Sequence, residues 1–275
     1  MASTKPTIVN VQGSFQTPQV YDALVTGLQD AGYAVVHPAL PSCSDVDRDD
    51  FPTRTLADDA LTVTETVKSL VEEGKLVVIV MHSYGGIVGS EAIPESLSHA
   101  ARQAQGKKGG VIHLFYYSAF ILGKGQSVFG TFGESPNNDV KPDGRFWIKN
   151  GAMLLYNDLP DAEAKLWESR LIPQSYKVQT MSVTRAAYEY VPSTYLICEN
   201  DKAAPPQYQE MFAGIAKSEV QRCNAGHSPM LSQPVLLAEQ IMAVADKAAA
   251  GLGSVRPGQL GANNDMIHST YAKRQ

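Results

Sequence analysis

The chain has 275 residues, 44% hydrophobic and 19% charged, with a net charge of −5 at pH 7. This composition is typical of a globular protein, and the absence of a basic run argues against nucleic-acid or anionic-membrane binding. The N-terminal residues contain no signal-peptide pattern, and the longest nearly apolar run, Val111 to Leu122, is too short to cross a bilayer. Three cysteines at unrelated spacings, Cys43, Cys198 and Cys223, favour reduced thiols and a cytoplasmic location.

Strand and helix patterns alternate along most of the chain. Short apolar runs predict strands at 7–11, 33–36, 75–82, 111–119, 193–198 and 219–223. Helical spacing and cap signals predict helices at about 18–31, 56–73, 87–92, 206–216 and 234–250, the second of them opened by a capping box of Thr55 and Asp58. This alternation predicts an α/β protein with a doubly wound, mostly parallel sheet.

The alternation breaks between residues 124 and 190. This stretch has Gly, Pro and Asn clusters, short amphipathic pieces and both tryptophans, Trp147 and Trp167. Such an insertion is typical of a cap, although ordinary core packing would also account for many of its aromatic residues. We therefore expect an α/β core from 1–123 and 191–250, a cap or lid at 124–190, and a mobile tail at 251–275.

The most informative motif follows the predicted strand at 75–82, where the sequence His82-Ser83-Tyr84-Gly85-Gly86 leads into a helix. A serine on a tight strand-to-helix turn is the nucleophile-elbow arrangement, and the nearby helix N-terminus stabilises developing negative charge. Met81 stands where this motif usually has its first glycine, so we expect a slightly opened elbow. A buried strand followed by a serine-capped helix would explain Ser83 but not the paired glycines.

A nucleophilic serine needs a histidine base and an acid that orients it. In a fold of this kind the acid and then the histidine follow the serine in the chain. Asp201 and His227 satisfy this order, and both follow predicted strands, whose carboxyl ends carry the ligand sites of open parallel sheets. We prefer Asp201 to Glu199 because it lies farther from the strand end. The predicted catalytic triad is Ser83, Asp201 and His227.

The intermediate of acyl transfer also needs backbone N–H donors in an oxyanion hole. Tyr84 follows the nucleophile, and Ser14 lies in the loop after the first strand, where Gly13 permits a close turn. Phe15 is the second choice for the latter donor, and a plain turn would also explain Gly13 and Ser14. The residues that we expect to contact substrate are Phe15, Phe120, Trp147 and Met230.

On these motifs the chain resembles the α/β-hydrolase superfamily, in the branch of small plant methylesterases and hydroxynitrile lyases and their uncharacterised fungal relatives. The matching segments are 13–15, 82–86, 117–120, 198–202 and 226–231. The resemblance covers roughly 5–125 and 190–245, and it implies an α/β-hydrolase fold with the triad and oxyanion donors named above. Gln12-Gly13 stands where the branch usually has His-Gly. The cap matches poorly, so no substrate is implied.

Three functions remain open. The leading one is a cofactor-free serine hydrolase that cleaves a carboxylic ester, thioester or lactone of a small, fairly apolar molecule through an acyl-serine. The second is a lyase, retro-aldol enzyme or cyclase with the same triad. The hydroxynitrile lyases of the branch carry threonine where Gly13 stands and lysine where Ser228 stands, which argues against cyanohydrin cleavage here. The third is a ligand-binding relative without catalysis.

No His/Asp cluster of the sequence has the spacing of metal ligands, so we expect neither a metal nor another cofactor. The expected partner is a small-molecule substrate, rather than nucleic acid or a membrane. A homodimer is left open.

Overall fold

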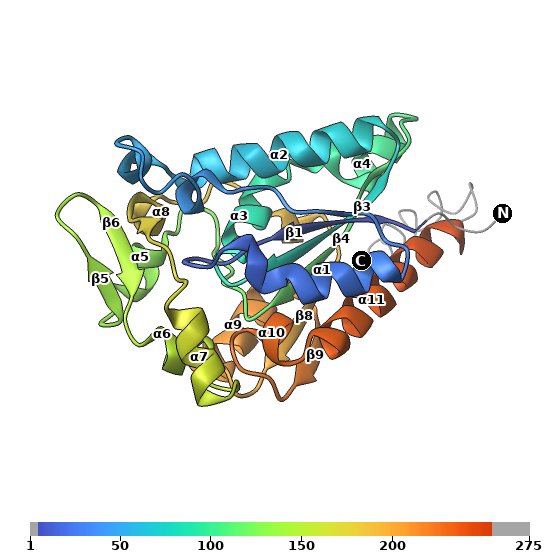
Figure 1. The fold of residues 1–275 in the computed structure, drawn as a ribbon. Helices are drawn as coiled ribbons and strands as arrows, with labels where there is room; N and C mark the ends of the chain where they lie inside the picture. The colour runs from blue at the N-terminus through green and yellow to red at the C-terminus, as the bar shows by residue number, and fades with distance from the viewer. Residues whose placement is uncertain (1–4, 255–275) are drawn as a thin grey trace, which may run out of the picture.

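A single parallel sheet forms the centre of the molecule. The computed structural model describes residues 5–254 (Figure 1). The sheet consists of β1 (Thr7–Val11), β2 (Val35–Val36), β3 (Leu76–His82), β4 (Gly110–Tyr117), β8 (Ser193–Cys198) and β9 (Glu219–Cys223). Its strands run parallel in the spatial order β2-β1-β3-β4-β8-β9. The predicted α/β fold with a mostly parallel sheet is confirmed.

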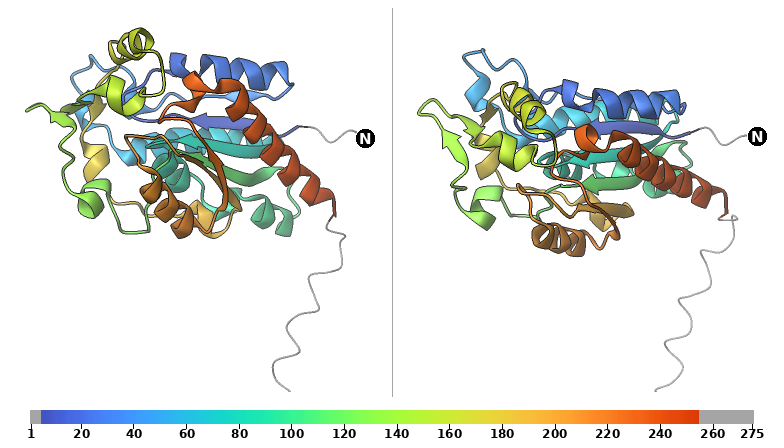
Figure 2. Two further views of the ribbon diagram at one scale, coloured as in Figure 1. Left: turned by 90° about the horizontal axis from the view of Figure 1, so that it is seen from below. Right: turned by 60° about the horizontal axis from the view of Figure 1, so that its bottom comes forward.

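Helices cover both faces of this sheet (Figures 1 and 2). On one face lie α2 (Leu56–Glu72), α3 (Gly85–Ala92), α4 (His99–Ala104) and α9 (Pro206–Ala216), and on the other lie α1 (Asp22–Asp30), α10 (Pro229–Ser232) and α11 (Pro234–Ser254). Short 3-10 helices are η1 (Pro18–Tyr21), η2 (Pro41–Cys43), η3 (Phe51–Thr53) and η4 (Glu95–Leu97). Helix α11 continues four residues beyond its predicted end, and the rest of the predicted tail, 255–275, lies outside the described residues.

Alternating side chains of the central strands build two hydrophobic layers. In β3, Val77, Ile79 and Met81 pack toward α2 and α3, whereas Val78 and Val80 pack toward α1 and α11. This period of two is the geometry of an extended strand, and burial on both faces explains why β3 is an unbroken apolar run. The predicted capping box at the start of α2 is also confirmed.

The register of the strands brings the site-bearing loops together. Val11 of β1 lies opposite Met81 of β3, so the loop after β1 adjoins the turn that contains Ser83. Cys198 of β8 lies opposite Cys223 of β9, so the loops that contain Asp201 and His227 leave the sheet side by side. All of these loops follow the carboxyl ends of parallel strands.

The segment between β4 and β8 covers this edge of the sheet (Figure 1). It contains a three-stranded antiparallel sheet and several short helices. These elements are α5 (Val128–Phe132), β5 (Asn138–Val140), β6 (Arg145–Ile148), α6 (Gly151–Leu155), α7 (Asp161–Glu168), β7 (Gln174–Ser175), α8 (Lys177–Thr180) and η5 (Ala187–Glu189). The apolar residues Phe146, Val178 and Val183 of this segment belong to the same buried cluster as α2 and α3.

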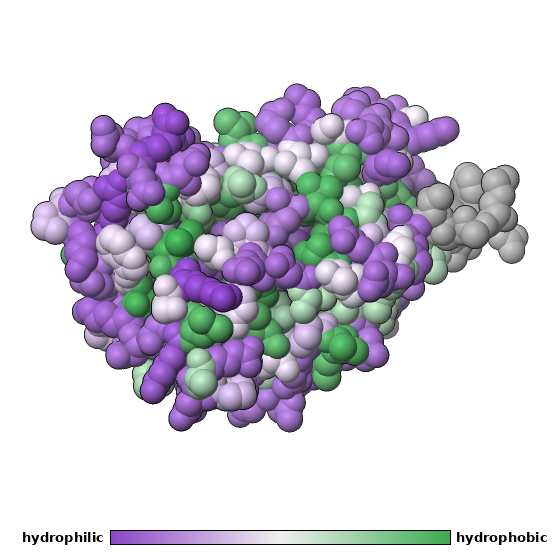
Figure 3. Space-filling view, viewed as in Figure 1, coloured by the Kyte–Doolittle hydropathy of each residue, from purple (hydrophilic) through white to green (hydrophobic). Residues whose placement is uncertain are grey.

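The surface seen in Figure 3 is mostly hydrophilic around its edge, and hydrophobic side chains gather nearer its middle. Within residues 5–254, no helix combines the length and hydrophobicity needed to span a membrane.

Candidate active site

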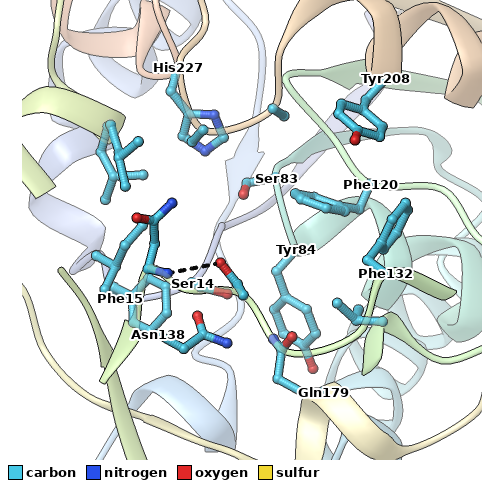
Figure 4. Close-up of a pocket in the computed structure, with 18 of the residues that line it drawn as sticks. Ser14, Phe15, Ser83, Tyr84, Phe120, Phe132, Asn138, Gln179, Tyr208 and His227 are labelled. Carbon is cyan, nitrogen blue, oxygen red and sulfur yellow. Dashed lines mark hydrogen bonds between the residues drawn. The ribbon is translucent and has the colours of Figure 1, made fainter. Parts of the chain in front are cut away.

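A pocket of about 440 Å³ lies between the core sheet and the covering segment, within the size range of small-molecule sites. Ser83 and His227 line it from the core, and Phe146 and Ile148 line it from β6. Figure 4 shows the Ser83 hydroxyl and the His227 imidazole facing the same cavity, with Phe120 beside them.

The turn that contains Ser83 has the geometry of a nucleophile elbow. Ser83 has a φ of 52°, in the left-handed region that non-glycine residues rarely occupy. A Cβ on Gly85 would lie 2.3 Å from the carbonyl oxygen of Val11, and a Cβ on Gly86 would lie 2.4 Å from that of Phe120. The paired glycines are therefore required by the close approach of two neighbouring loops.

Met81, which replaces the usual first glycine of the elbow, is accommodated within the following helix. A Cβ on Gly89 would lie 2.4 Å from Met81 Sδ, so in this structure the methionine side chain fills the space beside Gly89 of α3. The small residue that the motif needs is thus found one turn inside the helix.

Asp201 and His227 form a buried pair. The Nδ1 atom of His227 lies 2.9 Å from Oδ2 of Asp201, and each residue is only 2% exposed. The Asp201 carboxylate also accepts hydrogen bonds from the N–H groups of Ala203 and Ala204 and from the Gln209 amide. Because Nδ1 donates to the acid, Nε2 of the neutral ring is left as the acceptor.

Glu199, the alternative acid, lies elsewhere. Its exposed carboxylate forms an ion pair of 2.7 Å with Arg222. Within the described part of the chain, Ser83 and His227 make no direct hydrogen bond. In ligand-free enzymes such hydrogen bonds are often long and tighten when substrate binds.

Two backbone N–H groups face the neighbourhood of Ser83. Across residues 5–254, neither the Ser14 N–H nor the Tyr84 N–H donates a hydrogen bond to a protein atom, and both residues line the pocket. Phe15, the second candidate, adjoins Ser14 in the same loop and also lines the pocket.

Gly13 serves close approach rather than an unusual φ. A Cβ at this position would lie 2.9 Å from both His82 Nδ1 and Ser83 Cβ. A larger residue, such as the threonine of the hydroxynitrile lyases, would therefore displace the elbow or the loop.

The Tyr84 side chain is anchored by a buried acid. Its hydroxyl donates to Asp59 of α2 at 2.7 Å, and the same carboxylate accepts from the N–H and hydroxyl of Ser42. Burial is the main cause that raises the pKa of Asp59 to about 6. This acid was not singled out from the sequence, where it is one of two adjacent aspartates in a helix.

Two of the four predicted substrate-contacting residues, Phe15 and Phe120, line the pocket, and two do not. Trp147 lies between Phe146 and Ile148 on β6, so its side chain points to the opposite face of the strand, where Lys141 approaches its ring. Met230 is fully buried in the apolar cluster beneath α1 and α11.

Sequence reasoning missed most of the pocket wall. The aromatic residues that it did not name are Phe132, Phe146, Tyr208 and Phe212. The polar side chains that it did not name include Glu134, Asn138, Gln179 and Lys202. The spacing of Tyr208 and Phe212, four residues apart in a predicted helix, was a usable signal for a shared face.

Among residues 5–254, no group of three or more histidine, cysteine or acidic side chains is arranged to hold a metal ion.

Comparison with known proteins identifies the class. The sequence profile of the alpha/beta hydrolase family matches residues 11–240, and the chain belongs to this family. The alpha/beta hydrolase nvfD of Aspergillus novofumigatus is 31% identical over 252 residues, covering 89% of this chain and 98% of the relative. Methylesterase 7 of Arabidopsis thaliana is 28% identical over 214 residues, covering 71% and 79% of the two chains.

The solved structures agree with the sequence comparisons. The crystal structure of polyneuridine aldehyde esterase superposes with a TM-score of 0.69 at 18% identity, covering 88% of this chain and 100% of that chain. The resemblance to the superfamily and its methylesterase-like branch is therefore confirmed. The solved structure confirms the α/β-hydrolase fold.

Proposed function

We propose that the protein is a serine hydrolase that cleaves a carboxylic ester, thioester or lactone of a small, fairly apolar molecule. The observation that carries this proposal is the convergence on one pocket of an elbow serine, a buried His–Asp pair and two backbone N–H groups that find no protein acceptor among residues 5–254. Each of these groups matches one requirement of acyl transfer.

In the proposed reaction, Nε2 of His227 removes the proton of the Ser83 hydroxyl as its oxygen attacks the substrate carbonyl. The N–H groups of Ser14 and Tyr84 stabilise the oxyanion, a contribution of about 10²–10³-fold for each donor. His227 then protonates the leaving group, which leaves an acyl-Ser83. A water molecule activated by His227 releases the acid, and Asp201 holds the imidazole in the required tautomer.

The pocket wall supports an apolar substrate. Phe120 packs against Phe212 with ring centroids 5.3 Å apart, and Phe132 lies 6.1 Å from Tyr208. Aromatic walls favour ring-containing or branched groups, because such groups bury area at little entropic cost. The amide side chains of Asn138 and Gln179 on the opposite wall can form hydrogen bonds with an oxygen substituent of the substrate (Figure 4).

Mass spectrometry of the quenched enzyme tests the proposal. With a 4-nitrophenyl ester we expect a burst of 4-nitrophenol and an acyl adduct on Ser83. The Ser83→Ala variant should lack both and lose about 10⁴-fold or more in turnover. Absence of an adduct with every activated ester, together with turnover of a β-hydroxy ketone, would instead favour the lyase or retro-aldol alternative.

We also propose a cytoplasmic location. Three cysteines at unrelated spacings, Cys43, Cys198 and Cys223, support a reducing compartment. Cell fractionation tests the location, and light scattering of the purified protein tests whether it is a homodimer.

A further inference from the structure

A chain of buried hydrogen bonds joins the three loops around the pocket. The Gly13 N–H donates to the Tyr21 hydroxyl at 2.9 Å, and this hydroxyl lies 2.9 Å from Nδ1 of His82. On the other side of the ring, Nε2 of His82 lies 2.8 Å from the carbonyl oxygen of His227. The chain therefore connects the loop after β1, the elbow and the loop that contains the proposed base.

The direction of every hydrogen bond in this chain is fixed. A carbonyl oxygen can only accept, so Nε2 of His82 must carry the proton. In a neutral imidazole Nδ1 is then an acceptor, and the Tyr21 hydroxyl donates to it at 2.9 Å rather than to Oε1 of Gln16, which lies 3.4 Å away. Burial, together with the nearby His227, holds the pKa of His82 well below its ordinary value, in agreement with a neutral ring.

The two side chains of this hydrogen-bond network are also held rigidly by their surroundings. Tyr21 and His82 are both fully buried, and the His82 ring stacks on Tyr117 with centroids 4.9 Å apart and planes 19° apart. His82 has no access to the pocket and is not among the residues that line it. His82 can therefore support neighbouring residues of the site but does not contact substrate.

We propose that Tyr21 and His82 are positioning residues that hold the nucleophile, the base and the oxyanion loop in register. This inference rests on the proposed function, because Tyr21 and His82 are proposed to support the same active site. His82 directly precedes Ser83, Gly13 directly precedes Ser14, and the carbonyl oxygen that accepts from His82 belongs to His227 itself. A displacement of about 1 Å among reacting groups costs about 10²-fold in rate, so loss of the chain should be visible in the chemical step.

A second hydrogen bond joins two of the same loops. Nε2 of Gln16, in the loop after β1, lies 3.1 Å from the hydroxyl of Ser228, next to the base. Removing Tyr21 or His82 therefore loosens the arrangement of the loops without separating them.

The experiment compares three variants with two matched controls. Tyr21→Phe removes the central hydroxyl, His82→Leu removes both ring nitrogens, and His82→Gln restores a donor that can reach the His227 carbonyl. The control His113→Gln changes a half-buried histidine that bonds Thr194 outside the pocket, and the control Tyr33→Phe removes a buried tyrosine hydroxyl beside α11. The measurements are the rate of acylation by a 4-nitrophenyl ester, KM and melting temperature.

We expect Tyr21→Phe and His82→Leu to slow acylation by about 10- to 100-fold with KM within about twofold of the wild-type value. His82→Gln should recover about tenfold of that loss, and the controls should acylate at the wild-type rate. Unchanged acylation in Tyr21→Phe and His82→Leu would overturn the inference. So would a loss that follows melting temperature in test and control variants alike, or the absence of rescue by glutamine.

The wild-type reaction separates this inference from the proposed function. If the wild-type protein forms no acyl adduct, the proposed function fails, and NMR of ¹⁵N-labelled histidine then decides the positioning role without turnover. We expect the His227 ring resonances to shift in Tyr21→Phe and His82→Leu but not in the controls. Unchanged His227 resonances in both test variants would reject the positioning role.

Discussion

Ser83 occupies a strained backbone conformation that glycine would adopt freely. Its φ of 52° costs about 1 kcal/mol for a residue with a Cβ. We therefore predict that Ser83→Gly raises the free energy of unfolding by about 1 kcal/mol while abolishing turnover, and urea denaturation measures the gain. A Ser83→Ala control, which keeps the Cβ, should show no gain. Equal stability of all three proteins would mean that the turn carries no strain.

Asp201 and Glu199 form a matched pair, because one acid contacts His227 and the other contacts Arg222 at the surface. Asp201→Asn should lower kcat by about 10³–10⁴-fold, since an amide favours the wrong imidazole tautomer. Glu199→Gln should change kcat by less than about twofold, because exposed ion pairs contribute little. Steady-state kinetics on one ester checks both, and the reverse result would reassign the acid.

Asp59 should make stability depend on pH. Its folded pKa of about 6 lies above the ordinary value of 3.8, so its stabilising contribution is full below pH 4 and is lost as pH rises through 6. Asp59→Asn has no such loss. The free energy of unfolding of the variant minus that of the wild type should therefore increase between pH 4 and 7, by about 3 kcal/mol. A flat difference for Asp59→Asn between pH 4 and 7 would contradict the raised pKa of Asp59.

Strand β6 allows a test of which of its side chains contact substrate. Phe146 and Ile148 face the pocket, and Trp147 faces away from it. Phe146→Ala should therefore change kcat/KM unequally across esters of different acyl size, whereas Trp147→Ala should leave their ranking unchanged. Because Phe146 is 1% exposed, its loss should also lower stability by about 3–5 kcal/mol. A reordered ranking in Trp147→Ala would return that residue to the site.

The core elements could be predicted from the sequence because their signals are local. Buried parallel strands are short apolar runs, and helix α2 is announced by a capping box. The serine, the acid and the histidine could also be predicted, because each follows a predicted strand. An α/β fold brings the loops at these strand ends together.

The pocket wall could not be predicted because it depends on tertiary neighbours. The covering strands are only two to four residues long, too short for an alternating pattern to show that Trp147 faces away. Gly89, which makes room for Met81, has no signal in the elbow motif itself.

For the whole molecule, the covering segment between β4 and β8 shares part of its hydrophobic core with the sheet. Its Phe146, Val178 and Val183 belong to the cluster beneath α2 and α3. Hydrogen bonds fix it on separate sides of the pocket, from Ile172 N–H to the Phe15 carbonyl and from Gly226 N–H to Asp158.

The covering segment is held by these hydrogen bonds and apolar contacts, so moving it away from the pocket would expose part of the hydrophobic core. We therefore expect substrate to enter without movement of the covering segment, so that the enzyme shows no interfacial activation. We predict that its rate on a sparingly soluble ester follows the concentration of dissolved monomer and shows no jump when micelles form. A jump in rate at the critical micelle concentration would show that the covering segment opens at a lipid–water interface.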